Sequence, residues 1–299
     1  MSREPLNHPS PEVSFIIPCY NCRRTIGFAL KAVFEQETSL PFEVIVVDSS
    51  ANPIKEWIDL RFRKVRLIAS SERLSAGAAR NLGASASKGR FLAFLDADTV
   101  ALPNWLSALY PQLQKQQDLA VAGGAVQNGN PESMASRIQY WIEFSEFLPG
   151  SPAGRRRFLS SSNILIRRKA FEQAGGFDPA MAMAEDLLLM NALEGGIYFD
   201  NSTGIKHSHR SRWALVSQHL HELGYWSGKL RSNIDLPGSW LKRAPLLSLT
   251  LPFYRLALIL LRLWRGDRRQ AIQAVSGSPI LLAGLFHWTF GFIRGLRST

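Results

Sequence analysis

Short apolar runs alternate with amphipathic stretches through the first third of the chain. Runs rich in β-branched and aromatic residues predict strands at 13–17, 42–47, 65–69 and 91–95. The stretches at 23–34 and 76–87 predict helices. Strands that alternate with helices in this way indicate βαβ units and a parallel sheet. We therefore expect an α/β fold.

The middle of the chain is less regular. It predicts strands at 119–126 and 159–166, a helix at 131–147, and a loop at 150–157 with three consecutive arginines. Turn residues follow at Gly175, Gly176 and Pro179, ahead of the acidic pair Glu185-Asp186, which opens an apolar stretch.

Polar side chains follow several of the predicted strands directly. Tyr20, Asp48 and the triplet Asp96-Ala97-Asp98 stand at such positions. Ligands of open α/β sheets bind beyond the carboxyl ends of the strands. We therefore expect these residues to meet at one edge of the sheet.

The triplet has the strongest chemical signal. Asp96 and Asp98 are two residues apart, so they point to the same side of an extended chain. Neighbouring carboxylates repel each other unless a cation lies beside them, and Mg²⁺ or Mn²⁺ prefers such oxygen ligands. Solvated aspartates in a turn are the alternative for the triplet taken alone.

The composition changes near residue 241. Apolar segments at 245–264 and 279–293 flank a linker rich in arginine, and Pro252 and Arg255 interrupt the first segment. A membrane-spanning helix needs about 20 apolar residues. These segments better fit helices lying in a membrane interface, although buried helices of a soluble protein would have the same pattern. We expect a polar tail at 1–12, the α/β domain at 13–235 and a membrane-associating helical region at 240–299.

Charge and composition narrow the possible partners. The 299 residues carry a formal net charge of +11, which favours an anionic partner such as a membrane surface, a phosphorylated substrate or nucleic acid. No nucleic-acid-binding motif is present, so we expect no nucleic acid. The first residues are polar and contain no secretory signal, which predicts a cytoplasmic location.

Two cysteines, Cys19 and Cys22, are too few for a disulfide scaffold and fit a reducing compartment. Their Cys-x-x-Cys spacing at a strand-to-helix junction would also suit a thiol–disulfide oxidoreductase. No other redox feature accompanies the pair.

An ordered set of segments resembles family 2 glycosyltransferases. The similar segments are Val13-Ser-Phe-Ile-Ile-Pro-Cys-Tyr-Asn21, Glu43-Val-Ile-Val-Val-Asp48, Ala76-Gly-Ala-Ala-Arg-Asn-Leu-Gly83, Lys88 to Asp98, Ser161-Ser-Asn-Ile-Leu-Ile-Arg-Arg168, Gly175-Gly-Phe-Asp178 and Glu185-Asp186. They run in the family's order over residues 12–230. The resemblance implies the GT-A fold, a Rossmann-like nucleotide-diphospho-sugar transferase domain, and an inverting, metal-dependent transfer.

The resemblance also assigns roles to residues. Pro18, Tyr20, Asp48, Arg80 and Asp96 would bind the nucleoside-diphosphate sugar donor, with an ordinary surface salt bridge as the alternative for Arg80. Asp98 and His207 would bind Mg²⁺ or Mn²⁺. The family often has a second acidic residue after Asp48, where this sequence has Ser49-Ser50 and so lacks that carboxylate for a contact with the base.

Asp186 is the predicted general base. An inverting transfer needs one carboxylate to accept the proton of the acceptor hydroxyl, and burial against Leu187 to Met190 would tune its pKa. Capping of the helix is the alternative, and Glu185 is the less favoured proton acceptor. His209 better fits a hydrogen-bonded or surface histidine than a metal ligand. Arg210 and Arg212 fit a diphosphate, a lipid head group or a solvated basic face equally.

The acceptor is predicted more coarsely. Processive members of the family carry Gln-x-x-Arg-Trp after the base, whereas the nearest stretch here, Gln218-His-Leu-His-Glu222, lacks Arg-Trp. We therefore expect the addition of one sugar to a lipid-linked or cell-envelope glycan at the cytoplasmic face of the membrane, through residues 245–293. A polyprenyl-phosphate sugar transferase and an inactive nucleotide- or membrane-binding relative are alternatives. A nucleotidyltransferase would need a glycine-rich basic loop in place of Pro18-Cys-Tyr-Asn21.

Overall fold

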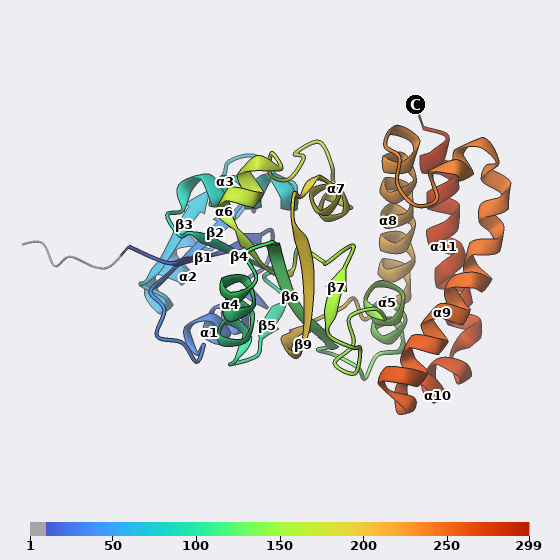
Figure 1. Ribbon diagram of the computed structural model, residues 1–299, viewed down its shortest axis with the longest axis horizontal. Coiled ribbons are helices and arrows are strands. Elements are labelled where there is room, and N and C mark those ends of the chain that lie inside the picture. Colours follow the sequence, from blue (N-terminus) through green and yellow to red (C-terminus); the bar gives the residue numbers. More distant parts are fainter. Residues whose placement is uncertain (1–9, 299) are drawn as a thin grey trace, which may run out of the picture.

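The computed structural model describes residues 10–298, so residues 1–9 of the expected polar tail lie outside the described part. A sheet covered by helices forms one part of the molecule, and a layer of long helices packs against one side of it (Figure 1).

The first half of the sheet is parallel, as predicted. Its strands are β1 (Val13–Cys19), β2 (Phe42–Asp48), β3 (Val65–Ala69) and β4 (Phe91–Leu95), in the order β3-β2-β1-β4. The helices that connect them are α1 (Ile26–Phe34), α2 (Lys55–Arg61) and α3 (Ala76–Ala86). Every residue of β4 is buried, because helices or strands cover it on all sides. A βαβ unit buries both faces of its strands in this way.

The second half of the sheet is mixed. Strand β8 (Asn163–Arg167) runs antiparallel to β4 and to β6 (Leu119–Asn128), and β6 runs parallel to β9 (Gly196–His207). Strands β5 (Thr99–Ala101) and β7 (Gly154–Arg156) pair antiparallel with β9. The loop predicted at 150–157 is therefore wrong in part, because residues 154–156 pair their backbone with β9. The helices of this half are α4 (Trp105–Lys115), α5 (Met134–Phe144), α6 (Arg168–Gln173) and α7 (Glu185–Ala192).

The helical layer begins earlier than the composition suggests. Its elements are α8 (Trp213–Asn233), the 3₁₀ turns η1 (Ser239–Arg243) and η2 (Pro245–Thr250), α9 (Leu251–Gly266), α10 (Arg268–Ser276) and α11 (Ser278–Leu296). Gly224 and Gly228 of α8 face Gly291 and Gly295 of α11, and a Cβ at any of the four would collide with backbone of the other helix. These glycines let the two helices touch backbone to backbone, so α8 packs with the C-terminal layer although it falls within the expected 13–235 domain.

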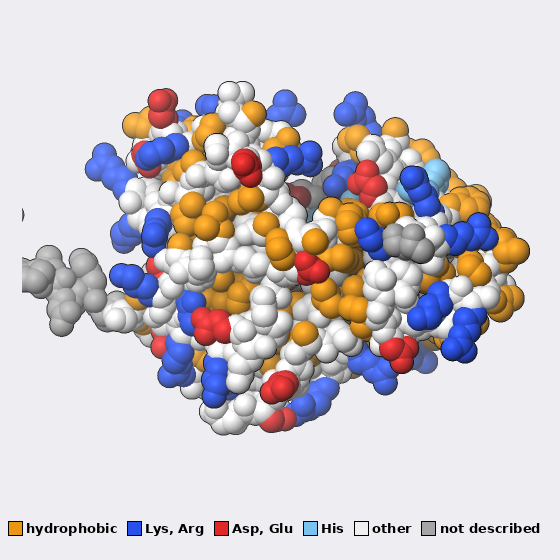
Figure 2. All heavy atoms as spheres, turned by 90° about the horizontal axis from the view of Figure 1, so that it is seen from above, with side chains coloured by type: hydrophobic (Ala, Val, Ile, Leu, Met, Phe, Trp, Pro, Cys, Tyr) orange, Lys and Arg blue, Asp and Glu red, His pale blue; other side chains and the backbone are white. Residues whose placement is uncertain are grey.

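The outer face of the helical layer is apolar. Segments Pro245–Gly266 and Ser278–Leu296 have, by length and composition only, the properties of a membrane-crossing helix, with mean hydropathies of 1.7 and 1.2, and the core helix of a soluble protein meets the same criteria. Only 22% of the first window is buried, against 44% of the second. Figure 2 shows hydrophobic side chains gathered at the helical end of the molecule, with Lys and Arg beside them. The exposed large side chains there are Trp240, Leu246, Leu247, Leu249, Phe253, Tyr254, Leu261, Trp264, Ile272, Val275, Ile280 and Phe290.

Candidate active site

A cavity of about 820 Å³ lies beyond the carboxyl ends of β1 and β4, and we call it the sheet-edge cavity. Pro18, Tyr20 and Asp96 line it, so three of the five predicted donor residues meet here. Tyr20 is 46% exposed, and the guanidinium of Arg73 lies 4.5 Å from its ring centroid. An exposed aromatic ring beside a cation offers a stacking surface for a planar, electron-rich group.

Asp96, Asp98 and His207 form a cluster in which one ligand atom of each residue lies within 4.8 Å of the others. The pairing of Thr99 in β5 with His207 in β9 brings the histidine to the aspartates, and His207 Nε2 lies 3.6 Å from Asp98 Oδ1. Burial, with a smaller contribution from Asp96, raises the pKa of Asp98, while His207 opposes the rise. Two carboxylates and an imidazole are a donor set that suits Mn²⁺ or Mg²⁺.

His209 supports this cluster from behind. Its Nδ1 lies 3.1 Å from Nδ1 of His207, and the residue is 6% exposed. Burial, together with the neighbouring His207, lowers the pKa of His209 to about 3, so its ring is neutral. A histidine fixed by a hydrogen bond at one nitrogen offers the other nitrogen as a ligand. The spacing of the two histidines, two residues apart, is the sequence signal for this pairing, because it puts them on one side of an extended chain. Arg210, the next residue, lines the sheet-edge cavity.

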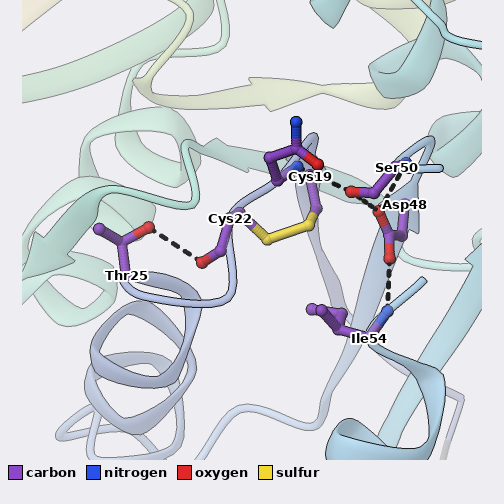
Figure 3. The surroundings of a disulfide bond; sticks show 7 residues. Cys19, Cys22, Thr25, Asp48, Ser50 and Ile54 are labelled. Atoms are coloured by element: carbon purple, nitrogen blue, oxygen red, sulfur yellow. Dashed lines mark hydrogen bonds between the residues drawn. A yellow bond between two sulfur atoms is a disulfide. The ribbon is translucent and has the colours of Figure 1, made fainter. Parts of the chain in front are cut away.

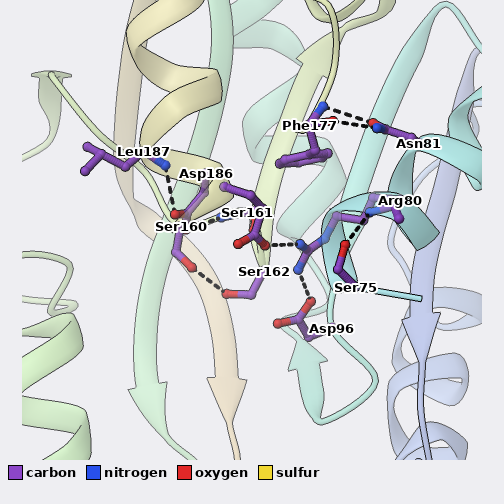
Figure 4. A network of polar contacts seen from close by, with 12 residues as sticks. Ser75, Arg80, Asn81, Asp96, Ser160, Ser161, Ser162, Phe177, Asp186 and Leu187 are labelled. Atoms are coloured by element: carbon purple, nitrogen blue, oxygen red, sulfur yellow. Dashed lines mark hydrogen bonds and ion pairs between the residues drawn. The ribbon is translucent and has the colours of Figure 1, made fainter. Parts of the chain in front are cut away.

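Arg80 lies beneath the cavity rather than in it. Its Nη2 is 2.6 Å from Asp96 and its Nη1 is 2.8 Å from Glu185, and the residue is 2% exposed (Figure 4). Both terminal nitrogens are therefore paired with carboxylates, and because the residue is buried these are not the surface salt bridge considered as the alternative. Arg80 instead holds Asp96 in place and joins it to the start of α7.

Asp48 does not line the sheet-edge cavity. The residue is fully buried, and its carboxylate accepts hydrogen bonds from the backbone N–H and hydroxyl of Ser50 and from the N–H of Ile54 (Figure 3). Those distances are 2.9, 2.6 and 2.9 Å. Three donors from its own loop use both oxygens, so Asp48 shapes the loop after β2 and is not exposed to a ligand.

Cys19 and Cys22 are joined by a disulfide in the turn between β1 and α1, although the sequence suggested reduced thiols (Figure 3). Both residues line the sheet-edge cavity. Asn21 between them has a φ of +54°, in the left-handed region, and its N–H donates to the hydroxyl of Ser50. The bridge thus closes a tight turn that is also tied to the loop of Asp48.

Asp186 lies on the other side of the Arg80 network, in the first turn of α7. Burial and the adjacent Glu185 raise its pKa to about 7, and Arg80 opposes the rise. Its oxygens accept hydrogen bonds from the N–H groups of Ser161 and Leu187, at 3.4 and 2.8 Å (Figure 4). The N-cap of α7 is Ala184, held at a φ of +62°, so Asp186 is not the capping residue. A carboxylate with such a pKa can accept a proton near neutral pH.

A pair of hydrogen bonds between the side chain of Asn81 and the backbone of Phe177 was not predicted from the sequence. The side-chain amide of Asn81 in α3 donates to the carbonyl of Phe177 at 2.6 Å and accepts from its N–H at 2.9 Å. This pair of bonds fixes the Gly175-Gly176 turn, where both glycines have positive φ, against the helix that carries Arg80. The only sequence signal was the resemblance that places Asn81 directly after Arg80.

A family model described as "Glycosyl transferase family 2" matches residues 14–175, more than half of the chain. Succinoglycan biosynthesis protein ExoO of Rhizobium meliloti (strain 1021) is 31% identical over 202 residues, which cover 62% of this chain and 57% of ExoO. O-antigen chain rhamnosyltransferase WbaN of Salmonella anatum is 24% identical over 67% of each chain. The chain thus spans little more than half of ExoO and two thirds of WbaN.

Solved structures resemble the fold. Mannosyltransferase PcManGT from Pyrobaculum calidifontis, in complex with GDP-Man and Mn²⁺, aligns with a TM-score of 0.63 at 16% identity, over 97% of this chain and 88% of its own. S. aureus TarS 1-349, in complex with UDP-GlcNAc, aligns with a TM-score of 0.56 at 16% identity, over 94% and 89%. These likenesses confirm the GT-A fold expected from the sequence.

Proposed function

Since the chain belongs to glycosyltransferase family 2, we propose that it transfers one sugar from a nucleoside-diphosphate sugar to a hydroxyl group, with inversion at the anomeric carbon. One observation carries the proposal. Arg80 forms ion pairs with Asp96 on one side and with Glu185 on the other. Asp96 belongs to the candidate metal site with Asp98 and His207, and Glu185 adjoins the buried Asp186. The same arginine therefore positions a candidate metal site and a candidate proton acceptor.

The donor would occupy the sheet-edge cavity. Tyr20, with Arg73 beside its ring, would stack on the nucleotide base, and Pro18 would lie along it. Asp98 and His207 would hold Mg²⁺ or Mn²⁺, with Asp96 facing the ribose and the metal. A bound divalent ion would supply positive charge to the leaving diphosphate. Arg210 would add a second positive charge on the same cavity wall.

Asp186 would accept the proton of the acceptor hydroxyl. The hydroxyl oxygen forms a bond to the anomeric carbon while the bond from that carbon to the diphosphate oxygen breaks, and the nucleoside diphosphate leaves. The proton goes to the Asp186 carboxylate. General-base assistance of this kind contributes about 10²–10⁴-fold to a rate. Glu185 is paired with Arg80, which supports Asp186 rather than its neighbour as the base.

The acceptor would be a lipid-linked or cell-envelope glycan at the cytoplasmic face of the membrane. A relative from Escherichia coli, 33% identical over 96 residues, is named UDP-Glc:alpha-D-GlcNAc-diphosphoundecaprenol beta-1,3-glucosyltransferase WfgD, with 31% of this chain and 38% of that protein aligned. The exposed apolar face of α9 and α10, with Arg265, Arg268 and Arg269 beside it, supports a helical layer lying in the membrane interface.

A screen of nucleotide sugars tests the proposal. The full chain is heated with each candidate donor, with and without Mn²⁺, and its melting temperature is recorded. We expect at least one donor to raise the melting temperature, and to do so more strongly with Mn²⁺, because a ligand that binds only the folded state stabilises it. No stabilisation by any donor would overturn the proposal.

A further inference from the structure

A second cavity, of about 440 Å³, lies where the sheet domain meets the helical layer, and we call it the seam cavity. Asp186 and Leu187 form part of its wall on the domain side. Three arginines of the helical layer reach it from the opposite side, namely Arg231 of α8 and Arg255 and Arg262 of α9. The predicted base therefore faces a basic wall that the donor site does not use.

Two of these arginines form no ion pair with an acidic side chain of residues 10–298. Arg262 pairs with Glu146 at 2.9 Å, and Glu143, also on the cavity wall, pairs with His219 at 3.0 Å. By contrast, in the described part of the chain Arg231 donates to the neutral oxygens of Ser227 and Pro237. Within residues 10–298, Arg255 donates to the Ile142 carbonyl at 3.2 Å, and its buried Nη1 has no hydrogen-bond partner.

An unpartnered guanidinium N–H in the interior is costly, because it has lost water and gained no acceptor. Arg255 is nevertheless held in a fixed position, with its guanidinium 4.2 Å from the ring centroid of Trp288. A planar fork of donors, oriented in advance, matches the oxygens of a phosphate group. The arrangement therefore favours a phosphoryl ligand over a neutral one.

We propose that the seam cavity binds a phosphate or diphosphate ester of the acceptor through Arg255 and Arg231, and so presents the adjoining sugar hydroxyl to Asp186. This inference rests on the proposed function, since it describes the acceptor of that same reaction. Helix α9 carries Arg255 on its inner side and Phe253 and Trp264, 57% and 55% exposed, on its outer side. If the outer side of α9 lies in the membrane, the phosphate of a lipid-linked acceptor has to pass only this one helix to reach the cavity.

The test uses the full chain without divalent metal, in EDTA, so that the Asp98 site does not take up the probe. Inorganic pyrophosphate is titrated by calorimetry into the wild-type chain and into Arg255→Gln, Arg231→Gln and Arg265→Gln. Arg265 is an exposed arginine of the same helix and serves as the matched control. We expect both seam variants to weaken binding by about tenfold or more, as loss of a charge-assisted hydrogen bond does, and Arg265→Gln to change nothing.

Wild-type affinity in Arg255→Gln, or no binding of pyrophosphate to the wild-type chain, would overturn the proposal. Nucleoside diphosphate with Mn²⁺ is titrated into each variant to show that it is folded, and Arg255→Lys is the variant to use if Arg255→Gln fails this check. Pyrophosphate bound through Arg255 by a chain that binds no nucleotide sugar would leave this subsite standing and refute the proposed function.

A second arm separates the two sources of the phosphate. Farnesyl diphosphate in phosphatidylcholine vesicles is compared with soluble pyrophosphate. Binding to the vesicles that is tighter and depends on Arg255 supports a lipid-borne acceptor. Equal affinity for the two probes would refute the proposal that the phosphate belongs to a lipid.

Discussion

The sheet-edge cavity and the seam cavity are built from the chain in different ways. The first takes most of its wall from the turns that follow β1, β3 and β4, all within the first hundred residues. The second takes most of its wall from α5, α7, α8, α9 and α11, and its lining residues are spread from residue 142 to residue 288. One is a feature of a local βαβ pattern, whereas the other exists only when the helical layer has docked.

That difference has a physical meaning for the reaction. Strand ends place side chains at one edge with little freedom, so the proposed donor side is organised by the sheet itself. The proposed acceptor side is organised by helix packing, and it includes the pair α8–α11 whose glycines bring their backbones together. The two sides are joined through Arg80, which bridges Asp96 and Glu185.

Loss of the metal ligand should have the largest effect. In Asp98→Asn the site loses one of its carboxylates, and with it the charge stabilisation of the leaving group, which is worth about 5 kcal/mol. We expect turnover to fall about 10⁴-fold, because each 1.36 kcal/mol is tenfold in rate. Steady-state transfer measured over a range of Mn²⁺ concentrations checks this. Asp59→Asn, at an exposed pair with Lys55 on α2, is the control, and turnover equal to that control would refute the metal site.

Loss of the base should rank second. Asp186→Asn should lower kcat about 10³-fold and leave donor binding intact, since the residue is on the acceptor side. In the wild-type chain, kcat/KM should rise with pH through an apparent pKa near 7, because only the ionised carboxylate accepts a proton. Rates at several pH values check both points. Near-normal turnover of the variant would favour an acceptor that is already ionised, such as a polyprenyl phosphate.

Asp186→Asn should also change the stability of the fold, in a direction that follows from the raised pKa of Asp186. The folded-state pKa of Asp186, about 7, lies above the ordinary 3.8, so the folded chain retains a proton that the unfolded chain has lost between these pH values. Stability from this group therefore falls as pH rises from about 4 to 7. Above pH 7 the Asn variant should melt at a higher temperature than the wild-type chain, as differential scanning calorimetry would record. A lower melting temperature would contradict the buried, unfavourable charge.

Breaking the bridge between the two sides should come third. Arg80→Met leaves the carboxylates of Asp96 and Glu185 without their shared partner, and removal of one member of a buried ion pair costs about 3–5 kcal/mol. The urea midpoint of unfolding measures the loss. Lys55→Met breaks an exposed pair and should leave the midpoint almost unchanged. Equal midpoints for the two variants would show that Arg80 does not support the site.

The smallest effect concerns the membrane surface. Phe253→Ser with Trp264→Ser removes two exposed side chains from the outer face of α9. Full burial of a side chain of this size contributes about 1.5–3 kcal/mol, and a membrane interface buries it only in part, so partition into anionic vesicles should fall by about tenfold. Sedimentation with vesicles measures it. Leu60→Ser, exposed on α2 in the sheet domain, is the control, and equal loss in both variants would argue against this face as the docking surface.

The parallel half of the sheet could be predicted from the sequence because its pattern is local. Strand periodicity located β1 to β4, and their ends located Tyr20 and Asp96 to Asp98. The pattern could not show that Arg80 is buried in ion pairs and Asp48 in hydrogen bonds, since these contacts depend on Glu185 and on the loop of Ser50. Nor could it show the contact of His207 with His209, which depends on how β9 is held beside β5.

The helical layer was harder to predict for the same reason. Composition indicated apolar, arginine-flanked segments after residue 241, but α8 has a mixed composition and shows its role only through Gly224 and Gly228 against α11. Likewise, Arg231 and Arg255 are far apart in the sequence, and nothing in their local pattern indicates a common cavity.

The glycine contact between α8 and α11 also bears on how this protein is best prepared for experiments. A shortened chain that ends before α9, chosen to remove the apolar surface, would strip α8 of its backbone-to-backbone partner and open one wall beside Asp186. Solubility is better improved by polar replacements on the outward side of α9 and α10, with every helix retained. Detergent or nanodisc preparations of the intact chain should accordingly keep acceptor-dependent turnover that the shortened chain loses.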